Sequence, residues 1–156
     1  MMKDYKMRRK DREASESVAR EILQCGEYGV LSTVGSDGFP YGVPLNYVFD
    51  GEKIYFHCAL NSGHKQENLN YCNKVSFCVV ASSEVVKEKF TTKFASAVVF
   101  GTAQKTIEKK QYALEKLVEK YSPEFEEQGM AEIKSAIAHT DIFEISVEKL
   151  SAKVHK

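Results

Sequence analysis

The chain has 156 residues, of which 43% are hydrophobic and 28% are charged, and this composition is typical of one soluble globular domain. Lysine plus arginine and aspartate plus glutamate both number 22, so the formal net charge is zero and no basic excess favours a nucleic-acid binder. No apolar run approaches the roughly 20 residues of a membrane helix, and the charged N-terminal segment lacks the apolar stretch of a secretion signal. We therefore expect a cytoplasmic protein that binds neither nucleic acid nor membrane.

One basic cluster lies within residues 3–12, and we interpret it as a solvated lead-in to a helix. The four cysteines include no C-x-x-C pair and fit no zinc-ligand spacing, so we expect no metal site. In a reducing compartment we expect them to be small buried hydrophobes: Cys25, Cys58, Cys72 and Cys78.

The first 60 residues predict one helix followed by three strands. Apolar residues at a spacing of four predict a helix over residues 11–24, which Gly26 is placed to end. Alternating apolar and polar positions then predict strands over residues 28–34, 41–49 and 53–59. Pro44 has no amide hydrogen, so the second strand is at an edge or irregular there. The pair Asp50-Gly51 is typical of a tight hairpin into the third strand.

The rest of the chain alternates helices with strands. Apolar residues at i, i+3, i+4 and i+7 predict an amphipathic helix over residues 108–121, which Pro123 stops. Residues 82–92 are polar and charged, and we expect a mobile loop there. The other predicted elements are short helices over residues 64–71 and 129–138 and strands over residues 74–81, 94–107 and 140–150.

The order of these elements indicates the fold class. Two links between the six predicted strands are tight hairpins, and helices follow the later strands. Neither a regular βαβ alternation nor a helical bundle fits this order. We therefore predict a mainly β fold, an antiparallel barrel with peripheral helices, in a single domain over residues 1–156.

The junction between a loop and the helix at residues 64–71 is the first candidate site. A helix N-terminus carries unpaired N–H groups and partial positive charge, which suit a phosphate group, and Gly63 lets the backbone approach a ligand closely. Lys65 in the first turn is unfavourable for the helix, and a bound anion would offset this mismatch. The alternative interpretation is a solvent-facing lysine after an ordinary turn.

His57 is the second candidate. It lies on the strand face opposite Phe56 and Cys58, near the end that leads to that junction, and histidine donates a proton or a hydrogen bond near neutral pH. No carboxylate is placed by the sequence to form a triad with it. Ser32 and Thr33 end the first strand and offer hydroxyl groups to a phosphate or a ring. The alternatives are a structural histidine and hydroxyls that simply cap a strand.

Eight short stretches stand in an order and spacing that are specific when taken together. They are MRRKDRE (7–13), GVLST (29–33), PYGVPLNY (40–47), IYFHCA (54–59), GHK (63–65), NKVSF (73–77), KFTTKF (89–94) and VVFG (98–101). In this arrangement they resemble the nitroimidazole-resistance (Nim) family, a branch of the pyridoxamine 5′-phosphate oxidase-like flavoproteins. Beyond about residue 105, only a helical region followed by a final strand matches.

The resemblance implies a six-stranded split β-barrel that forms a homodimer, with two sites for flavin mononucleotide (FMN) at the subunit interface. It implies that the polar edge of the isoalloxazine ring meets the backbone groups that follow Pro44, those of Leu45, Asn46 and Tyr47. It also implies that residues of the next strand form the neighbouring wall of the site: His57, Cys58 and Ala59. Because His57 matches the active-site histidine of the family, we expect it to face the substrate or the flavin.

The resemblance also implies which residues hold the phosphate group of the flavin. They are Gly63, His64 and Lys65, together with Ser32 and Thr33. From an adjoining strand, Thr92 and Ser96 are expected to reach the flavin.

The leading hypothesis is an FMN-dependent reductase that acts on nitroaromatic compounds or related small molecules. Residues 144–156 contain no arginine, whereas the oxidase branch has an arginine-rich tail, so oxidation of pyridoxamine phosphate is disfavoured. Two alternatives stay open. One is a non-catalytic module that binds or senses flavin, and the other is a haem-binding relative with His57 or His64 as the axial ligand.

Overall fold

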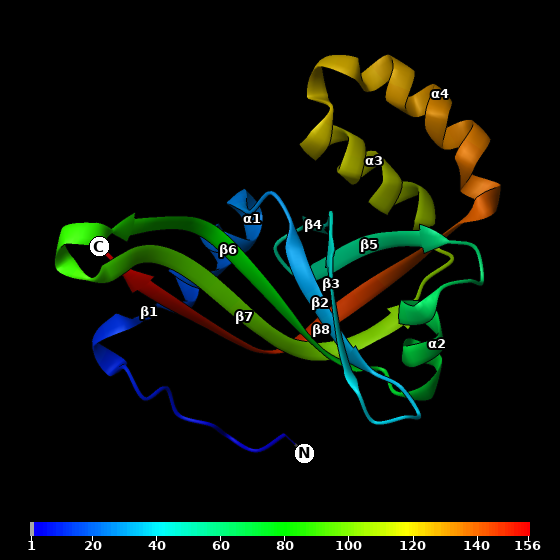
Figure 1. Cartoon of the computed structure of the whole chain (residues 1–156). Coiled ribbons are helices and arrows are strands. Elements are labelled where there is room, and N and C mark those ends of the chain that lie inside the picture. The colour runs from blue at the N-terminus through cyan, green and yellow to red at the C-terminus, as the bar shows by residue number, and fades with distance from the viewer. Residues whose placement is uncertain (1) are drawn as a thin grey trace.

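The computed structural model describes residues 2–156, which form one twisted antiparallel sheet with helices around it (Figure 1). The strand order is β3-β2-β6-β7-β8-β5-β4, and the short β1 pairs with β8 outside this path. The sheet curls without closing, as in a split barrel, and β3 and β4 are its two ends. The strands are β1 (Glu13–Ala14), β2 (Gly29–Val34), β3 (Pro40–Leu45), β4 (Val48–Phe49), β5 (Lys53–Ala59), β6 (Lys74–Val86), β7 (Thr91–Lys105) and β8 (Thr140–His155).

The helices lie on both sides of this sheet. They are α1 (Glu16–Cys25), α2 (His64–Tyr71), α3 (Lys110–Tyr121) and α4 (Glu126–Ala136). Short 3-10 turns cover Lys10–Arg12, Lys87–Lys89, Pro123–Phe125 and Ile137–His139. α3 and α4 form a hairpin of helices in which α3 lies against β4 and β5 and α4 lies further from the sheet (Figure 1).

The main core lies on the inner face of the curled sheet, where α1 packs. Ala19 and Leu23 of α1 are fully buried there against strand residues such as Phe77 and Val99. The buried ring of Tyr47 meets Phe77 edge-on, with ring centroids 4.9 Å apart, and its hydroxyl group donates to the Leu23 carbonyl at 2.6 Å. This hydrogen bond satisfies a polar group that would otherwise be costly to bury.

A second, smaller core lies on the outer face of the sheet beneath α3. Ala113 and Leu117 of α3 pack against Val48, Tyr55 and Ile142. The outward face of β5 is therefore covered at Tyr55. Two residues further along the same face, His57 is exposed, because the cover ends before it.

All six predicted strands are present, but one of them is interrupted, and the helix before the first strand begins later than predicted. The predicted helix at 11–24 begins only at Glu16, because Ser15 caps it by accepting a hydrogen bond from the Val18 amide at 3.3 Å. The preceding Glu13–Ala14 pairs with β8. The predicted strand at 41–49 is interrupted at residues 46–47, and its two parts, β3 and β4, end opposite edges of the sheet.

The expected mobile loop at 82–92 is wrong. β6 continues to Val86, a single 3-10 turn follows, and β7 begins at Thr91. Two opposite charges lie across from each other in this hairpin, because Glu84 is the register partner of Lys93. A polar hairpin of this kind shows no apolar alternation, so the periodicity of the sequence did not reveal it. β8 likewise extends past the predicted end at residue 150, to His155.

The cysteines are only partly as expected. Cys58 is buried, but Cys25 is exposed at the end of α1 and the other two are half-buried.

Candidate functional site

The loop between β5 and α2 places the helix N-terminus that the sequence singled out. The loop leaves β5 after Ala59, and the Leu60 amide donates to the His139 carbonyl at 3.1 Å. Asn61 then turns the chain with a φ of 47°, and Gly63 with a φ of 96° precedes the first helical residue. Both are left-handed conformations, which suit asparagine and glycine. The chain therefore reverses within four residues and starts α2 beside the end of β5.

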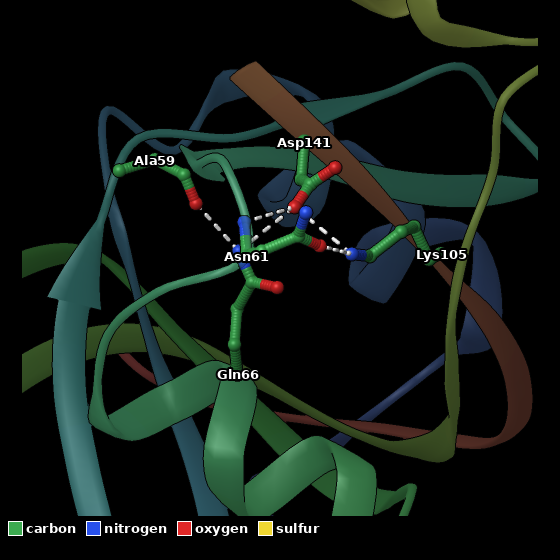
Figure 2. Close-up of polar contacts among 5 residues, drawn as sticks. All are labelled: Ala59, Asn61, Gln66, Lys105 and Asp141. Atoms are coloured by element: carbon green, nitrogen blue, oxygen red, sulfur yellow. Dashed lines mark hydrogen bonds and ion pairs between the residues drawn. The ribbon is translucent and has the colours of Figure 1, made fainter. Parts of the chain in front are cut away.

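A buried carboxylate fixes this loop (Figure 2). One oxygen of Asp141, Oδ2, accepts hydrogen bonds from the Asn61 amide at 2.7 Å, from Gln66 Nε2 at 3.1 Å and from Lys105 Nζ at 2.9 Å. Gln66 Nε2 also donates to the Ala59 carbonyl at 2.6 Å, and Lys105 Nζ donates to Asn61 Oδ1 at 2.9 Å. β8, β7, the loop and α2 are thus joined at one point.

The ionised state of Asp141 follows from these contacts. Burial by itself raises the pKa of this carboxyl group, but the hydrogen bonds from Asn61, Lys105 and Gln66 hold it below its usual value. The network is therefore charged at neutral pH, with Lys105 as counter-ion.

Lys65 and His57 lie close enough to influence each other. His57 keeps part of its ring exposed, yet desolvation by the surrounding protein lowers its pKa, and the positive charge of Lys65 lowers it further. The imidazole is therefore mainly neutral at pH 7, able to donate and to accept a hydrogen bond. Within residues 2–156, Lys65 forms no ion pair or hydrogen bond, so its charge is uncompensated.

The neighbouring strands attach to α2 through two side chains. Thr33 is buried, and its hydroxyl oxygen accepts a hydrogen bond from Asn68 Nδ2 of α2 at 3.0 Å. The ring of His64 stacks on Tyr41 of β3, with centroids 4.0 Å apart. Ser32 is half-buried on the opposite face of β2 from Thr33. Thr33 and His64 therefore hold α2 in place. Both residues lie at the end of the sheet where α2 begins.

The bend between β3 and β4 carries three of the predicted flavin contacts. Leu45 is half-buried and Asn46 is exposed, whereas Tyr47 is fully buried. Both backbone groups of Tyr47 are engaged by the end of α3: its amide donates to the Tyr121 hydroxyl oxygen at 3.0 Å, and its carbonyl accepts from Lys120 Nζ at 2.9 Å. Leu45 pairs with Gly29 in the ladder between β3 and β2, so the accessible backbone of this bend is that of Asn46.

Lys120 is itself unusual. Its Nζ lies 3.8 Å from the centroid of the Tyr47 ring, a cation–π contact. Desolvation lowers its pKa to about 8, because little water reaches the ammonium group there.

The remaining predicted residues lie apart from one another. Ala59 ends β5 beside the loop, whereas the Cys58 side chain points into the main core. Burial raises the pKa of the Cys58 thiol to about 11, so it is protonated at neutral pH. Thr92 and Ser96 lie on β7 towards the β6–β7 turn, at the opposite end of the sheet from α2 (Figure 1). One protomer does not bring these two residues to Lys65.

Sequence reasoning missed several residues that organise this end of the sheet. Asp141 and Gln66 gave no motif, although a carboxylate within the apolar pattern of β8 is a signal of a buried polar network. Lys120 and Tyr121 ended the predicted amphipathic helix without any sign of their contact with the distant bend. Across the described residues, no group of three or more His, Cys, Asp or Glu side chains is placed to hold a metal ion. None of the helices in residues 2–156 has the length and hydropathy needed to cross a bilayer.

The influence of Lys65 on His57 is testable without any ligand. Replacing Lys65 by Met removes the charge and keeps the length, so the pKa of His57 should rise towards its usual value. It should not reach that value, because burial is the larger cause of the shift. NMR titration of the His57 ring, assigned with His57→Gln, measures this change. Lys134→Met, on the exposed part of α4, should leave the titration unchanged, and a His57 pKa that stays constant in Lys65→Met would contradict the placement of Lys65.

The fold resembles those of several solved proteins. A conserved hypothetical protein of Mycobacterium tuberculosis matches with a TM-score of 0.81, 20% identity, and coverage of 97% of this chain and 91% of that one. A candidate 5-nitroimidazole antibiotic resistance protein of Bacteroides thetaiotaomicron matches with a TM-score of 0.72, 19% identity, and coverage of 90% and 84%. An FAD and haem binding protein of Mycobacterium smegmatis matches with a TM-score of 0.74, 18% identity, and coverage of 93% and 74%.

No curated protein sequence matches the chain significantly. The family model described as pyridoxamine 5′-phosphate oxidase, however, matches residues 15–154, which is nearly the whole chain. It agrees with the split-barrel topology and with the family resemblance of the sequence motifs. The chain therefore belongs to the pyridoxamine 5′-phosphate oxidase family of split-barrel proteins.

Proposed function

We propose that this protein binds FMN beside the N-terminus of α2, and that it is a flavin-dependent reductase of nitroaromatic or related small molecules. The observation that carries the proposal is Lys65, an unpaired cation in the first turn of α2. No side chain among residues 2–156 caps this helix. A cation at the positive end of a helix dipole is unfavourable alone, and a bound phosphate group removes the conflict.

The groups at this end of the sheet fit a flavin phosphate. The amides of His64 and Lys65 form no hydrogen bond within residues 2–156 and are free to donate, because the first bond of the helix runs from the Gln66 amide to the Gly63 carbonyl at 3.1 Å. Gly63 has no side chain to block them, and a Cβ atom built there meets nothing within 4 Å. Lys65 and the hydroxyl group of Ser32 complete the predicted donor set, whereas Thr33 and His64 contribute through their hold on α2.

The ring of the flavin would lie between the bend after β3 and the exposed end of β5. Asn46 has backbone groups free for its polar edge, Leu45 lies beside it at the paired end of β3, and Tyr47 would fix the bend beneath them. On the other side, His57 and Ala59 face outward from β5. The flavin supplies the redox chemistry, and the protein positions it and provides hydrogen-bonding groups. A neutral His57 is suited to donate a hydrogen bond to the ring or to the nitro group, and its protonated minority form can donate a proton as the nitro group is reduced.

The proposed assembly is a homodimer, and an open sheet face supports it. The outer face of β6 and β7 carries alternating residues that no helix covers, among them Val80, which is 50% exposed, and Phe100, which is 39% exposed. A groove of about 1310 Å³ lies over this face, bordered by residues 2–8 and by strands β6 to β8. Ser96 and Val98 line the same groove. A second copy placed here would bury the apolar face and bring Thr92 and Ser96 towards the α2 end of its partner.

Two of the similar proteins bear on the proposed flavin chemistry. One is described as a candidate 5-nitroimidazole resistance protein and another as an FAD and haem binding protein. The first agrees with the reductase proposal, and the second makes FAD and haem the alternatives that the test must separate. The proposal places the protein in the cytoplasm, where reduced nicotinamide donors are available.

Purified protein should show the flavin absorption bands and release FMN when it is denatured. The released compound is to be identified by chromatography against FMN, FAD and riboflavin. With the flavin reduced by dithionite, addition of a 5-nitroimidazole should reoxidise it in a single turnover. In His57→Ala the same reoxidation should be slower by about 10²-fold, because the proton donor is missing.

His139→Ala is the matched control, since that exposed side chain forms no hydrogen bond or ion pair within residues 2–156 and the carbonyl bond to Leu60 is retained. A colourless protein that also takes up no added flavin would overturn the proposal. A Soret band would favour the haem alternative, and bound FMN without reoxidation would favour a flavin sensor.

The open face gives a separate prediction. Phe100→Asp should convert the dimer to a monomer and weaken FMN binding, because a charge on the apolar face prevents association and removes the residues of the partner from the site. Sedimentation and flavin titration measure the two effects. Ile107→Asp is the control, because Ile107 is 83% exposed but lies off this face, before α3. A wild-type monomer that binds FMN fully would contradict the proposed interface.

A further inference from the structure

Two buried carboxylates of β8 occupy closely similar surroundings. The Asp141 and Glu144 side chains are 8% and 7% exposed, and each pairs with a lysine that is about one-third exposed. Each also accepts a hydrogen bond from a glutamine amide: Asp141 from Gln66 at 3.1 Å and Glu144 from Gln104 at 3.0 Å. As local stabilising groups the two are therefore similar, apart from the additional bond that Asp141 accepts from the Asn61 amide.

They differ in what they hold. Glu144 joins Lys53 of β5 to Gln104 of β7, two strands that already flank β8 in the sheet. Its loss leaves the backbone ladder between these strands in place. Asp141 instead joins the sheet to two elements that lie outside it, the loop at residues 60–63 and the helix α2 (Figure 2).

The contacts of Asp141 determine where α2 begins. Its bond to the Asn61 amide holds the left-handed turn of that residue, and its bond to Gln66 holds the first turn of the helix. Gln66 follows Lys65 directly, and Asn61 lies two residues before Gly63. The buried carboxylate therefore sits behind the group of residues proposed to meet the phosphate, without reaching the surface itself.

We propose that Asp141, with Lys105 and Gln66, is a positioning network that gives this site its preference for a phosphorylated flavin over an unphosphorylated one. This inference rests on the proposed function, because it concerns the same site. Asp141 is a positioning residue that acts through α2 and does not contact the ligand. When the network is broken, the amides of α2 and Lys65 lose their alignment, and the phosphate contribution to binding falls. The ring contributes as before, since its contacts come from the bend after β3 and from β5.

The test compares FMN with riboflavin, which lacks the phosphate group. The dissociation constants of both are measured with the full-length protein after bound flavin has been removed. In Asp141→Asn the ratio of the riboflavin to the FMN dissociation constant should fall by about tenfold, because misplacement of binding groups weakens the contact they make. Riboflavin binding should change little. Glu144→Gln should lower thermal stability to a comparable degree and leave the ratio within about twofold.

A second readout does not depend on flavin. Asp141 is not among the causes of the lowered His57 pKa, so loss of its charge alone should not raise that pKa, whereas displacement of Lys65 away from His57 would raise it. The inference therefore expects a higher His57 pKa in Asp141→Asn and no change in Glu144→Gln. Asp141→Ala, paired with Glu144→Ala, removes the acceptor as well as the charge, in case the asparagine oxygen retains the donors.

The outcomes separate this inference from the proposed function. If wild-type protein binds neither flavin, the proposed function fails, and the phosphate preference fails with it. If wild-type protein prefers FMN but the preference and the His57 pKa are the same in both Asp141 variants, only the positioning role is overturned. An equal loss of preference in the Glu144 variants would also overturn it, because the effect would then be general destabilisation.

Discussion

A carboxylate that leaves water on folding must recover its lost hydrogen bonds from the protein, and the structure at the α2 end of the sheet follows from this requirement at Asp141. Three donors converge on one oxygen, from the loop after β5, from α2 and from β7. Each donor has to stand about 3 Å away, so the carboxylate fixes three elements relative to one another. A short helix that lies outside the sheet is thereby attached directly to it.

The second constraint acts at the other side of the same region. β3 and β4 end opposite edges of the sheet, so the two residues between them must cross from one edge to the other. Tyr47 anchors that crossing through its ring in the core and through its backbone bonds to Tyr121 and Lys120. The helices inserted between β7 and β8 thus reach back to a bend more than 60 residues earlier. They are part of the framework of the candidate site and not only a cover for the sheet.

The sequence predicted the parts of the fold that follow from local periodicity. Alternation gave the six strands, and the spacing of Leu114, Leu117 and Tyr121 gave α3. It failed where long-range pairing decides the structure. The polar hairpin tip at 82–92 is ordered by its ladder, and residues 13–14 join β8 in place of the first helical turn. Similarly, the Gly63-His64-Lys65 motif was visible, but Asp141, 76 residues after Lys65, was not, because one carboxylate in a strand does not reveal which donors the fold brings to it.

The positions of the remaining motif residues bear on why the chain would need a partner. Lys65 and His57 lie at one end of the sheet, and Thr92 and Ser96 lie towards the other (Figure 1). In the sheet His57 lies opposite Ile142 of β8 and Ser96 lies opposite Lys153, eleven residues further along, and at about 3.3 Å per residue this separation exceeds the length of a flavin ring system. No rearrangement of loops closes such a distance within one rigid sheet. If all these residues serve one ligand, as the family resemblance implies, they must come from two chains. The outer face of β6 and β7, which no helix covers, would then be the surface where the two copies meet. Contact there would place the binding residues of one copy at the site of the other.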